Sequence, residues 1–350
     1  MAKVNPSTNP GGEAAEPTAD PLERLPLSRG ALRWLRPVAR VLNIRVGDLG
    51  ALVALVLLVG VFAALAPGFR TFDNLITVSR QVSVDAVIAA GMTMVIITAG
   101  IDLGVGSLVA VASVLVASLL TEHDLNVGLA VLLTLLVLGA FGAFNGFVIA
   151  KVKLPPFIAT LAMFAAARGL AQVYTNGEVI IVDNEDFLKV GLGYVGPIPV
   201  PVIIAAVVLL LAHVTLSRTK FGRYVYAIGG NEEAARISGI PVDRVKASVY
   251  VISGLVSAIG GIILTARLLA GDPQAGVGAE LDVIAAVVIG GTSLFGGVGN
   301  IRGTLIGALI IGVISNGLTI LDVQTFWQSV VKGIVILLAI TIDTQLRRVR

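Results

Sequence analysis

Four polar side chains interrupt long apolar stretches of the sequence and are the first candidates for chemistry: Asp102, Asn145, Arg168 and Asn316. A charged or amide group among apolar residues needs a partner, a water-filled cavity or a ligand, because leaving it unpaired is costly. Amides both donate and accept hydrogen bonds, which suits a ligand rich in hydroxyl groups. We therefore treat these residues as candidates for lining a transport path. Pairing within the protein is the alternative for each, and at Asp102, beside a glycine-rich break, capping of a helix is favoured.

A second candidate is the short polar segment 231–239. Asn231 can cap the N-terminus of a helix, with two glutamates in its first turn. Alanine favours helix, and Gly239 can end it because glycine readily adopts a left-handed backbone. The pattern predicts a short polar helix that could fit a groove on another protein. Its candidate contact residues are Asn231, Glu232, Glu233, Ala234, Ala235, Arg236 and Gly239.

Several kinds of catalytic site are excluded. The chain has no cysteine, which rules out disulfides, thiolate metal sites and cysteine nucleophiles. Its two histidines, His123 and His213, are far apart, so no metal site is expected. No Gly-Lys dipeptide occurs, so a P-loop is absent. We expect no enzymatic activity and no cofactor in this chain.

The composition is typical of a membrane protein. Hydrophobic residues make up 56% of the 350 residues and charged residues only 13%, and the mean hydropathy is +0.94. A soluble domain carries about 25% charged residues. The net charge is only +3 and the basic residues are clustered, so nucleic acid is not expected as a partner.

The long apolar runs predict an all-α polytopic fold, because backbone polar groups must pair internally in lipid. A helix that crosses roughly 30 Å of hydrocarbon needs about 20 mostly apolar residues. The glycine-rich stretch Gly100–Gly104 predicts a broken or re-entrant element. Gly142 and Gly146 are one turn apart, a spacing that lets helices approach closely. About ten spans are expected, over residues 49–66, 83–100, 104–121, 127–150, 156–174, 199–216, 247–268, 281–297, 303–321 and 326–343.

Lys and Arg near the ends of spans orient the chain, because they concentrate on the cytoplasmic side. Residues 24–45 contain six Arg and no acid, and residues 217–246 are also basic. Residues 175–198 and 270–282 are acidic, as expected of the opposite side, whereas residues 67–82 carry two Arg and are an exception. Both termini are therefore expected in the cytoplasm.

The expected organisation follows from these runs. Residues 1–23 are rich in Pro and polar residues and predict a disordered cytoplasmic tail. Residues 24–48 form a basic segment, either a helix lying on the membrane surface or a plain topogenic flank. A transmembrane domain spans 49–343 and contains the cytoplasmic loop 217–246, and residues 344–350 form a basic tail.

Several motifs resemble one family. Glu233-Ala234-Ala235 with Gly239 resembles the coupling motif of the permeases of ATP-binding-cassette (ABC) importers, whose helix docks onto the ATPase subunit. Over residues 49–343 the chain resembles ribose- and xylose-type sugar permeases, although Gly104 stands where many relatives have Ser. The motifs that carry this likeness are Ala90–Thr93, Ala99–Ser107, Phe144–Gly146, Pro156–Leu161, Ala167–Leu170, Gly290–Gly299 and Asn316–Leu318.

The resemblance implies a bacterial inner-membrane importer with the fold of the vitamin B12-type permeases. It implies a second permease copy, two ABC ATPase subunits and a periplasmic or lipid-anchored sugar-binding protein. The substrate would be a pentose or hexose. A permease for branched-chain amino acids or nucleosides is the alternative, because those families have a similar architecture. An ion-coupled carrier is disfavoured, since it would leave the cytoplasmic Glu-Ala-Ala segment without a purpose.

Overall fold

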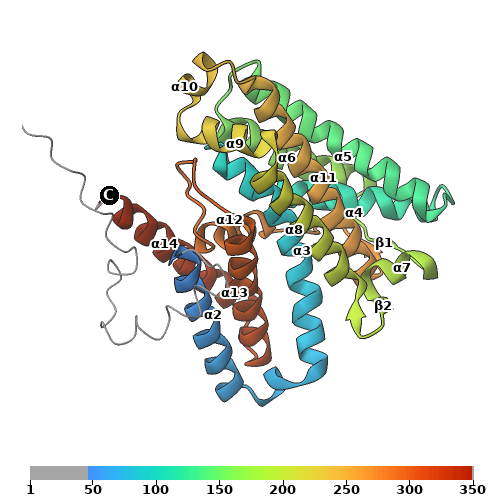
Figure 1. Cartoon of the computed structure of the whole chain (residues 1–350). Helices are drawn as coiled ribbons and strands as arrows, with labels where there is room; N and C mark the ends of the chain where they lie inside the picture. The colour runs from blue at the N-terminus through green and yellow to red at the C-terminus, as the bar shows by residue number, and fades with distance from the viewer. Residues whose placement is uncertain (1–45, 349–350) are drawn as a thin grey trace, which may run out of the picture.

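The computed structural model describes residues 46–348, except for the side chains of residues 46–48 and of part of the last helix. The predictions for residues 1–23 and 24–45 lie outside the described residues. The apolar helices, which Figure 1 shows as one bundle, are α2 (Val46–Leu65), α3 (Phe72–Ile97), α4 (Val105–Thr121), α5 (Val127–Ala150), α6 (Pro156–Thr175), α8 (Val200–Arg218), α11 (Val242–Leu268), α12 (Ala279–Ile289), α13 (Ile301–Ile320) and α14 (Thr325–Arg348).

Within the described residues, six helices are long and apolar enough to cross a membrane: α3, α5, α6, α8, α11 and α13. Residues 49–65 of α2 and the whole of α4 form shorter apolar helices. The fold is thus that of a mostly helical, multi-pass membrane protein, as the sequence predicted. The larger figure of about ten crossings stays a prediction.

Short elements connect the long helices. They are the 3-10 turn η2 (Pro67–Arg70), α7 (Glu185–Leu192), α9 (Lys220–Gly230), α10 (Glu232–Ile237) and the strands β1 (Ile180–Ile181), β2 (Tyr194–Val195), β3 (Ile198–Pro199) and β4 (Ala270–Gly271). Strand β1 pairs antiparallel with β4, and β2 with β3. Helices α9 and α10 lie at one end of the bundle, and α7 lies with the strands at the other (Figure 1).

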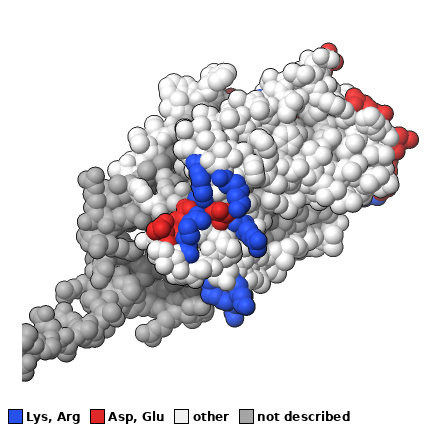
Figure 2. All heavy atoms as spheres, turned by 90° about the horizontal axis from the view of Figure 1, so that it is seen from above, with Lys and Arg blue, Asp and Glu red and all other residues white. Residues whose placement is uncertain are grey.

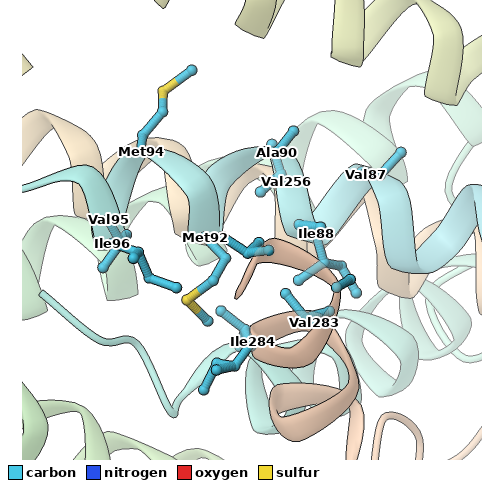
Figure 3. Close-up of a cluster of buried hydrophobic side chains, with 14 of the residues drawn as sticks. Val87, Ile88, Ala90, Met92, Met94, Val95, Ile96, Val256, Val283 and Ile284 are labelled. Atoms are coloured by element: carbon cyan, nitrogen blue, oxygen red, sulfur yellow. The ribbon is translucent and has the colours of Figure 1, made fainter. Parts of the chain in front are cut away.

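Helix α3 runs through the centre of the bundle. From residue 86 to residue 97 its sequence is almost wholly apolar on every face, as is typical of a helix segment buried all round. Figure 3 shows side chains of α3, such as Ile88 and Met92, beside Val283 and Ile284 of α12. Glycine allows a close approach to α11, since a Cβ on Gly91 would lie 2.5 Å from Cγ2 of Val256. Burial of α3 thus depends on its neighbouring helices rather than on its own pattern.

Helices α5 and α11 pack closely, as the glycine spacing predicted. A Cβ on Gly146 would lie 2.7 Å from the Cα of Ala247, and one on Gly142 would overlap the carbonyl oxygen of Tyr250. Any larger residue at either position would push the two backbones apart.

The structure corrects the expected spans in two ways. Residues 281–297 do not form one helix: α12 ends at Ile289, and the connection to α13 contains three glycines with positive φ, Gly291, Gly296 and Gly297. Several helices also run past their apolar core, so α3 begins at Phe72 rather than near residue 83 and α14 continues to Arg348, into the expected basic tail. Hydropathy marks the lipid-facing part of a helix but not the polar turns beyond it.

Candidate functional site

Helix α10 has the cap and the stop that the sequence predicted. Oδ1 of Asn231 accepts a hydrogen bond from the backbone N–H of Ala234 (2.9 Å). Beyond the last turn, Gly239 has φ +79° and its N–H donates to the carbonyl of Arg236 (3.0 Å). The N–H of Ile240 donates to the carbonyl of Ala235 (3.1 Å), which completes a Schellman cap. A six-residue helix is marginal alone, so these caps define its ends.

Ion pairs hold α10 against its neighbours. Oε2 of Glu232 accepts from Lys246 of α11 (2.9 Å), and Oε1 accepts from Arg236 (3.3 Å). Arg236 also reaches Asp243, in the first turn of α11 (3.0 Å). The same carboxylate accepts from Lys153, in the connection between α5 and α6 (2.9 Å). Residues 151–153, α10 and the start of α11 therefore form one charged unit.

These charges lower the pKa of Glu232 and form a cluster on the surface at the α10 end. Burial alone would raise the pKa of Glu232, but hydrogen bonds and charges from Lys246 and Arg236 outweigh it, so the pKa of this carboxyl lies below its usual value. Figure 2, viewed from the α10 end, shows Lys and Arg gathered around a few Asp and Glu. The unit is thus charged but internally compensated.

The outer face of α10 is free of such pairing. Glu233 is exposed and has no hydrogen bond or ion pair within the described residues. Ile237 lies four residues later, on the same helical face, and is 79% exposed. Within the described chain, this face of α10 is therefore unoccupied and open to a partner.

The seven predicted contact residues therefore divide by role. Asn231 and Gly239 shape the helix, Ala235 is buried beneath it, and Glu232 and Arg236 pair within the chain. Glu233 and Ala234 remain on the exposed side. Sequence reasoning missed Ile237, although its i+4 spacing from Glu233 was a usable signal. It also missed Asp243 and Lys153, which only the fold brings together.

Helix α9 connects α10 to the centre of the bundle. Gly229 packs so tightly on the C-terminal end of α3 that a Cβ there would overlap the carbonyl oxygen of Ile97. The N–H of Gly297, in the α12–α13 connection, donates to that same carbonyl (2.9 Å). The hydroxyl of Tyr226 in α9 donates to the carbonyl of Gly299 (2.8 Å). A displacement of α9 would therefore act directly on both the central helix and the α12–α13 connection.

The favoured alternative, capping of a helix by Asp102, is not seen: the N-cap of α4 is Gly104, and no side chain caps this helix. Asp102 instead binds the turn that precedes α4. Its Oδ1 accepts from the backbone N–H of Gly104 (3.0 Å), and its Oδ2 accepts from the hydroxyl of Ser253 on α11 (2.7 Å). The side chain is buried, and the buried hydroxyl of Tyr250 nearby has no partner among the described residues. A Cβ on Gly100 would lie 2.5 Å from that hydroxyl, so a larger residue between α3 and α4 would have to displace the Tyr250 side chain.

Arg168 pairs with backbone carbonyls rather than with an acid. Its Nη1 donates to Pro273 (2.9 Å) and Ala275 (2.7 Å), and its Nη2 donates to Gly106 of α4 (3.3 Å). Glu280 also lies close to Gly106, and its buried Oε2 has no hydrogen-bond partner among the described residues. Arg168 thereby ties α6 to α4 and to the segment before α12.

The two amides lie elsewhere. Asn145 is buried on α5, and its Nδ2 has no partner among the described residues. Asn316 exchanges two hydrogen bonds with Asn74 of α3 (3.0 and 2.8 Å). Of the four predicted path residues, Asp102 and Arg168 bind backbone groups at the N-terminal end of α4, whereas Asn316 pairs with α3. Among the described residues, no group of three His, Asp or Glu could hold a metal.

Comparisons with known proteins agree with this architecture. The family model described as the permease component of a branched-chain amino acid transport system matches residues 74–340. The chain is 49% identical to the ribose import permease protein of Bacillus subtilis over 297 residues, which cover 84% of this chain and 92% of that one. It is 46% identical to the ribose import permease protein of Escherichia coli over 299 residues, 84% and 93% of the two chains. No solved structure matches. The chain belongs to the family of ABC-importer permeases that this model describes, which is the family that its motifs predicted.

Proposed function

We propose that this chain is the transmembrane permease subunit of an ATP-driven importer for a sugar, with a pentose as the first candidate. The names of the relatives support the substrate class, since they include ribose, L-arabinose and xylose permeases at 36–49% identity. The family description names branched-chain amino acids instead, and these are the competing substrate. A permease does no chemistry on its cargo. In this proposal the partner ATPase binds ATP and Mg.

In this proposal α10 docks onto the ATPase subunit. The observation that carries it is the direct path from the exposed pair Glu233 and Ile237, through α9, to the carbonyl of Ile97. ATP-driven motion of a partner needs a rigid element to reach the membrane core, because a flexible loop would absorb it. The caps of α10 give it a defined helical shape, and its ion pairs attach it to the start of α11.

The α10 end is proposed to face the cytoplasm, with both termini on that side and a sugar-binding protein contacting the α7 end. The localisation is the bacterial inner membrane, and two copies of the chain enclose the path. This orientation follows from the basic 217–246 segment and the acidic 175–198 segment.

Cysteine placed at Asp186 should react with an impermeant reagent in intact cells, and cysteine at Glu232 should not. Since the chain has no native cysteine, labelling is unambiguous, and the reverse pattern would invert the orientation.

We propose fewer residues for the lining of the path than the sequence suggested. Asn145 keeps an unpaired amide and is the best-placed group for hydroxyl contacts, whereas Asp102, Arg168 and Asn316 are already paired. Arg168→Leu removes three hydrogen bonds and should reduce folding stability by about 2–4 kcal/mol. Normal stability with lost transport would instead place Arg168 on the path. Asn145→Ala should lower transport while stability changes by less than about 1 kcal/mol.

Reconstitution tests the function as a whole. The permease, its ATPase and its binding protein are placed in liposomes, and ATP hydrolysis is measured with ribose, with L-arabinose or with leucine. Stimulation by a pentose alone supports the proposal. Stimulation by leucine alone would overturn the proposed substrate class but not the proposal that the chain belongs to an importer. Robust ATP hydrolysis by the purified permease without the ATPase would overturn the proposal that a separate subunit hydrolyses ATP.

A further inference from the structure

A cavity of about 720 Å³ opens at the α10 end of the molecule, apart from the outer face of α10. It lies between the C-terminal end of α8, helix α9 and the N-terminal end of α13. Its polar lining is basic, with His213, Arg218, Arg223 and Arg302 and no Asp or Glu. A cavity of this volume would hold a molecular headgroup rather than a single ion.

Two of the basic residues of the cavity are not neutralised by acids of the described chain. Arg218 and Arg223 are exposed and make no ion pair with an acid in residues 46–348. Helix α13 starts at Ile301 in the cavity wall, so its positive dipole end adds to the same field. Two guanidinium groups with a helix N-terminus favour a phosphate, because guanidinium matches phosphate oxygens in a bidentate geometry.

One wall of the cavity continues into an apolar surface. Leu210 and Val214 of α8 are 61% and 43% exposed, and they precede Ser217 of the cavity at helical spacing. An occupant that combines a phosphate with long apolar chains would satisfy both surfaces at once. A small soluble phosphate would leave the apolar stripe unused.

We propose that this cavity binds the phosphate of an anionic phospholipid, with its acyl chains lying along α8. The orientation proposed above puts the cavity at the cytoplasmic leaflet, where anionic headgroups meet basic side chains. Because α9 forms part of the wall and contacts Ile97 of α3, a bound lipid would brace the link between α10 and the bundle. This inference uses the proposed orientation only to decide which leaflet supplies the lipid. Binding of the lipid to the cavity does not depend on it.

Binding is tested on the purified full-length chain in detergent, titrated with phosphatidylglycerol and followed by native mass spectrometry. Phosphatidylcholine, which is zwitterionic, is the reference lipid. The double variant Arg218→Gln with Arg223→Gln should bind phosphatidylglycerol roughly tenfold more weakly or worse, since each basic residue contributes about 1 kcal/mol. The matched control is Arg244→Gln, which removes an exposed charge of the same kind outside the cavity and should leave the affinity unchanged.

Four results would overturn the assignment. Equal affinity for the two lipids, or equal loss in the Arg244→Gln control, would show general attraction to a basic face. Stabilisation of the chain by inorganic phosphate, with displacement of phosphatidylglycerol, would assign the cavity to a soluble phosphate ligand. Binding that begins only after deletion of the acidic residues 1–23 would show that this segment occupies the cavity. The assay needs neither transport nor ATPase, so its failure leaves the proposed function untouched.

Discussion

Helices α9 and α10 are neighbours in the sequence but attach to the bundle in opposite ways. Helix α9 is held by close backbone contact, with Gly229 against Ile97 and no space for a side chain. Helix α10 is held by side-chain ion pairs around Glu232 and Arg236, and its outer face touches nothing in the described chain. Direct backbone contact, as at α9, passes a displacement on to its neighbour. Partly solvated ion pairs, as at α10, can rearrange at little cost in free energy.

The difference suggests a division of labour between the two helices. Helix α10 presents a surface that a partner can bind, and α9 passes the resulting motion to α3. Substitutions in α9 should therefore damage folding and coupling together, while substitutions on the outer face of α10 should damage coupling alone. Expected losses of folding stability thus decrease from α9 to the outer face of α10.

Gly229→Val should have the largest effect, more than about 3 kcal/mol, because its side chain would overlap the backbone of α3. The measurement is the thermal midpoint and the monodisperse fraction of the purified chain in detergent. Gly230→Ala is the matched control, since a Cβ at Gly230 meets nothing within 4 Å and alanine favours helix. If both variants behave alike, close packing of α9 is not what links it to α3.

Gly239→Val should have a smaller and local effect. Its φ of +79° costs a non-glycine residue about 1–2 kcal/mol, although the space around it is open. The C-terminal end of α10 should fray, and sugar-stimulated ATP hydrolysis and uptake should fall together at nearly normal abundance. Gly239→Asn tolerates the left-handed backbone and should retain most activity. Full uptake by Gly239→Val would mean that α10 need not be structured.

Acid should loosen α10 by a small amount. The pKa of Glu232 is lower in the folded chain than in the unfolded one, so its contribution is complete above the unfolded pKa, about 4.3, and is lost as the pH falls through the folded value. The group is partly solvated, so the effect should stay below about 1 kcal/mol. Hydrogen exchange of the α10 amides, corrected for intrinsic rates, measures it. In Glu232→Gln the part of this pH dependence that comes from Glu232 should disappear. The part from Asp243 should remain at lower pH, because hydrogen bonds from Lys153 and Arg236 lower the pKa of that carboxyl to about 2.

Glu233→Arg should leave folding stability within about 0.5 kcal/mol, because Glu233 has no partner in the described chain. Co-purification with the ATPase should nevertheless weaken at least about tenfold if a basic site receives this carboxylate, since like charges would then meet. Ile237→Ala tests the apolar half of the surface with no change of charge. Undiminished co-purification and uptake in both variants would remove α10 from the coupling interface.

Local signals were enough to predict much of this molecule. Uncharged apolar runs predicted most of the long helices, because lipid forces helix wherever polar side chains are missing. Asn231 and Gly239 predicted both ends of α10, since capping depends on residues only a few positions apart. The family motifs, which are also continuous in sequence, predicted the family.

Contacts between distant segments were decided only by the tertiary structure. The glycine-rich 281–297 segment is apolar enough for a span, yet α12 ends at Ile289, and a hydrogen bond from Gly297 to Ile97 positions the connection to α13. Hydropathy marks the cost of Arg168 inside an apolar run but not its partners, which are three carbonyls from other segments. Its role on the path stays a prediction. Burial of α3, pairing of Asp243 with Lys153 and the basic cavity beside α9 likewise depend on how helices far apart in sequence meet. The composition of a segment determines whether it lies in lipid or in water. The packing of the whole chain determines which other segments it contacts.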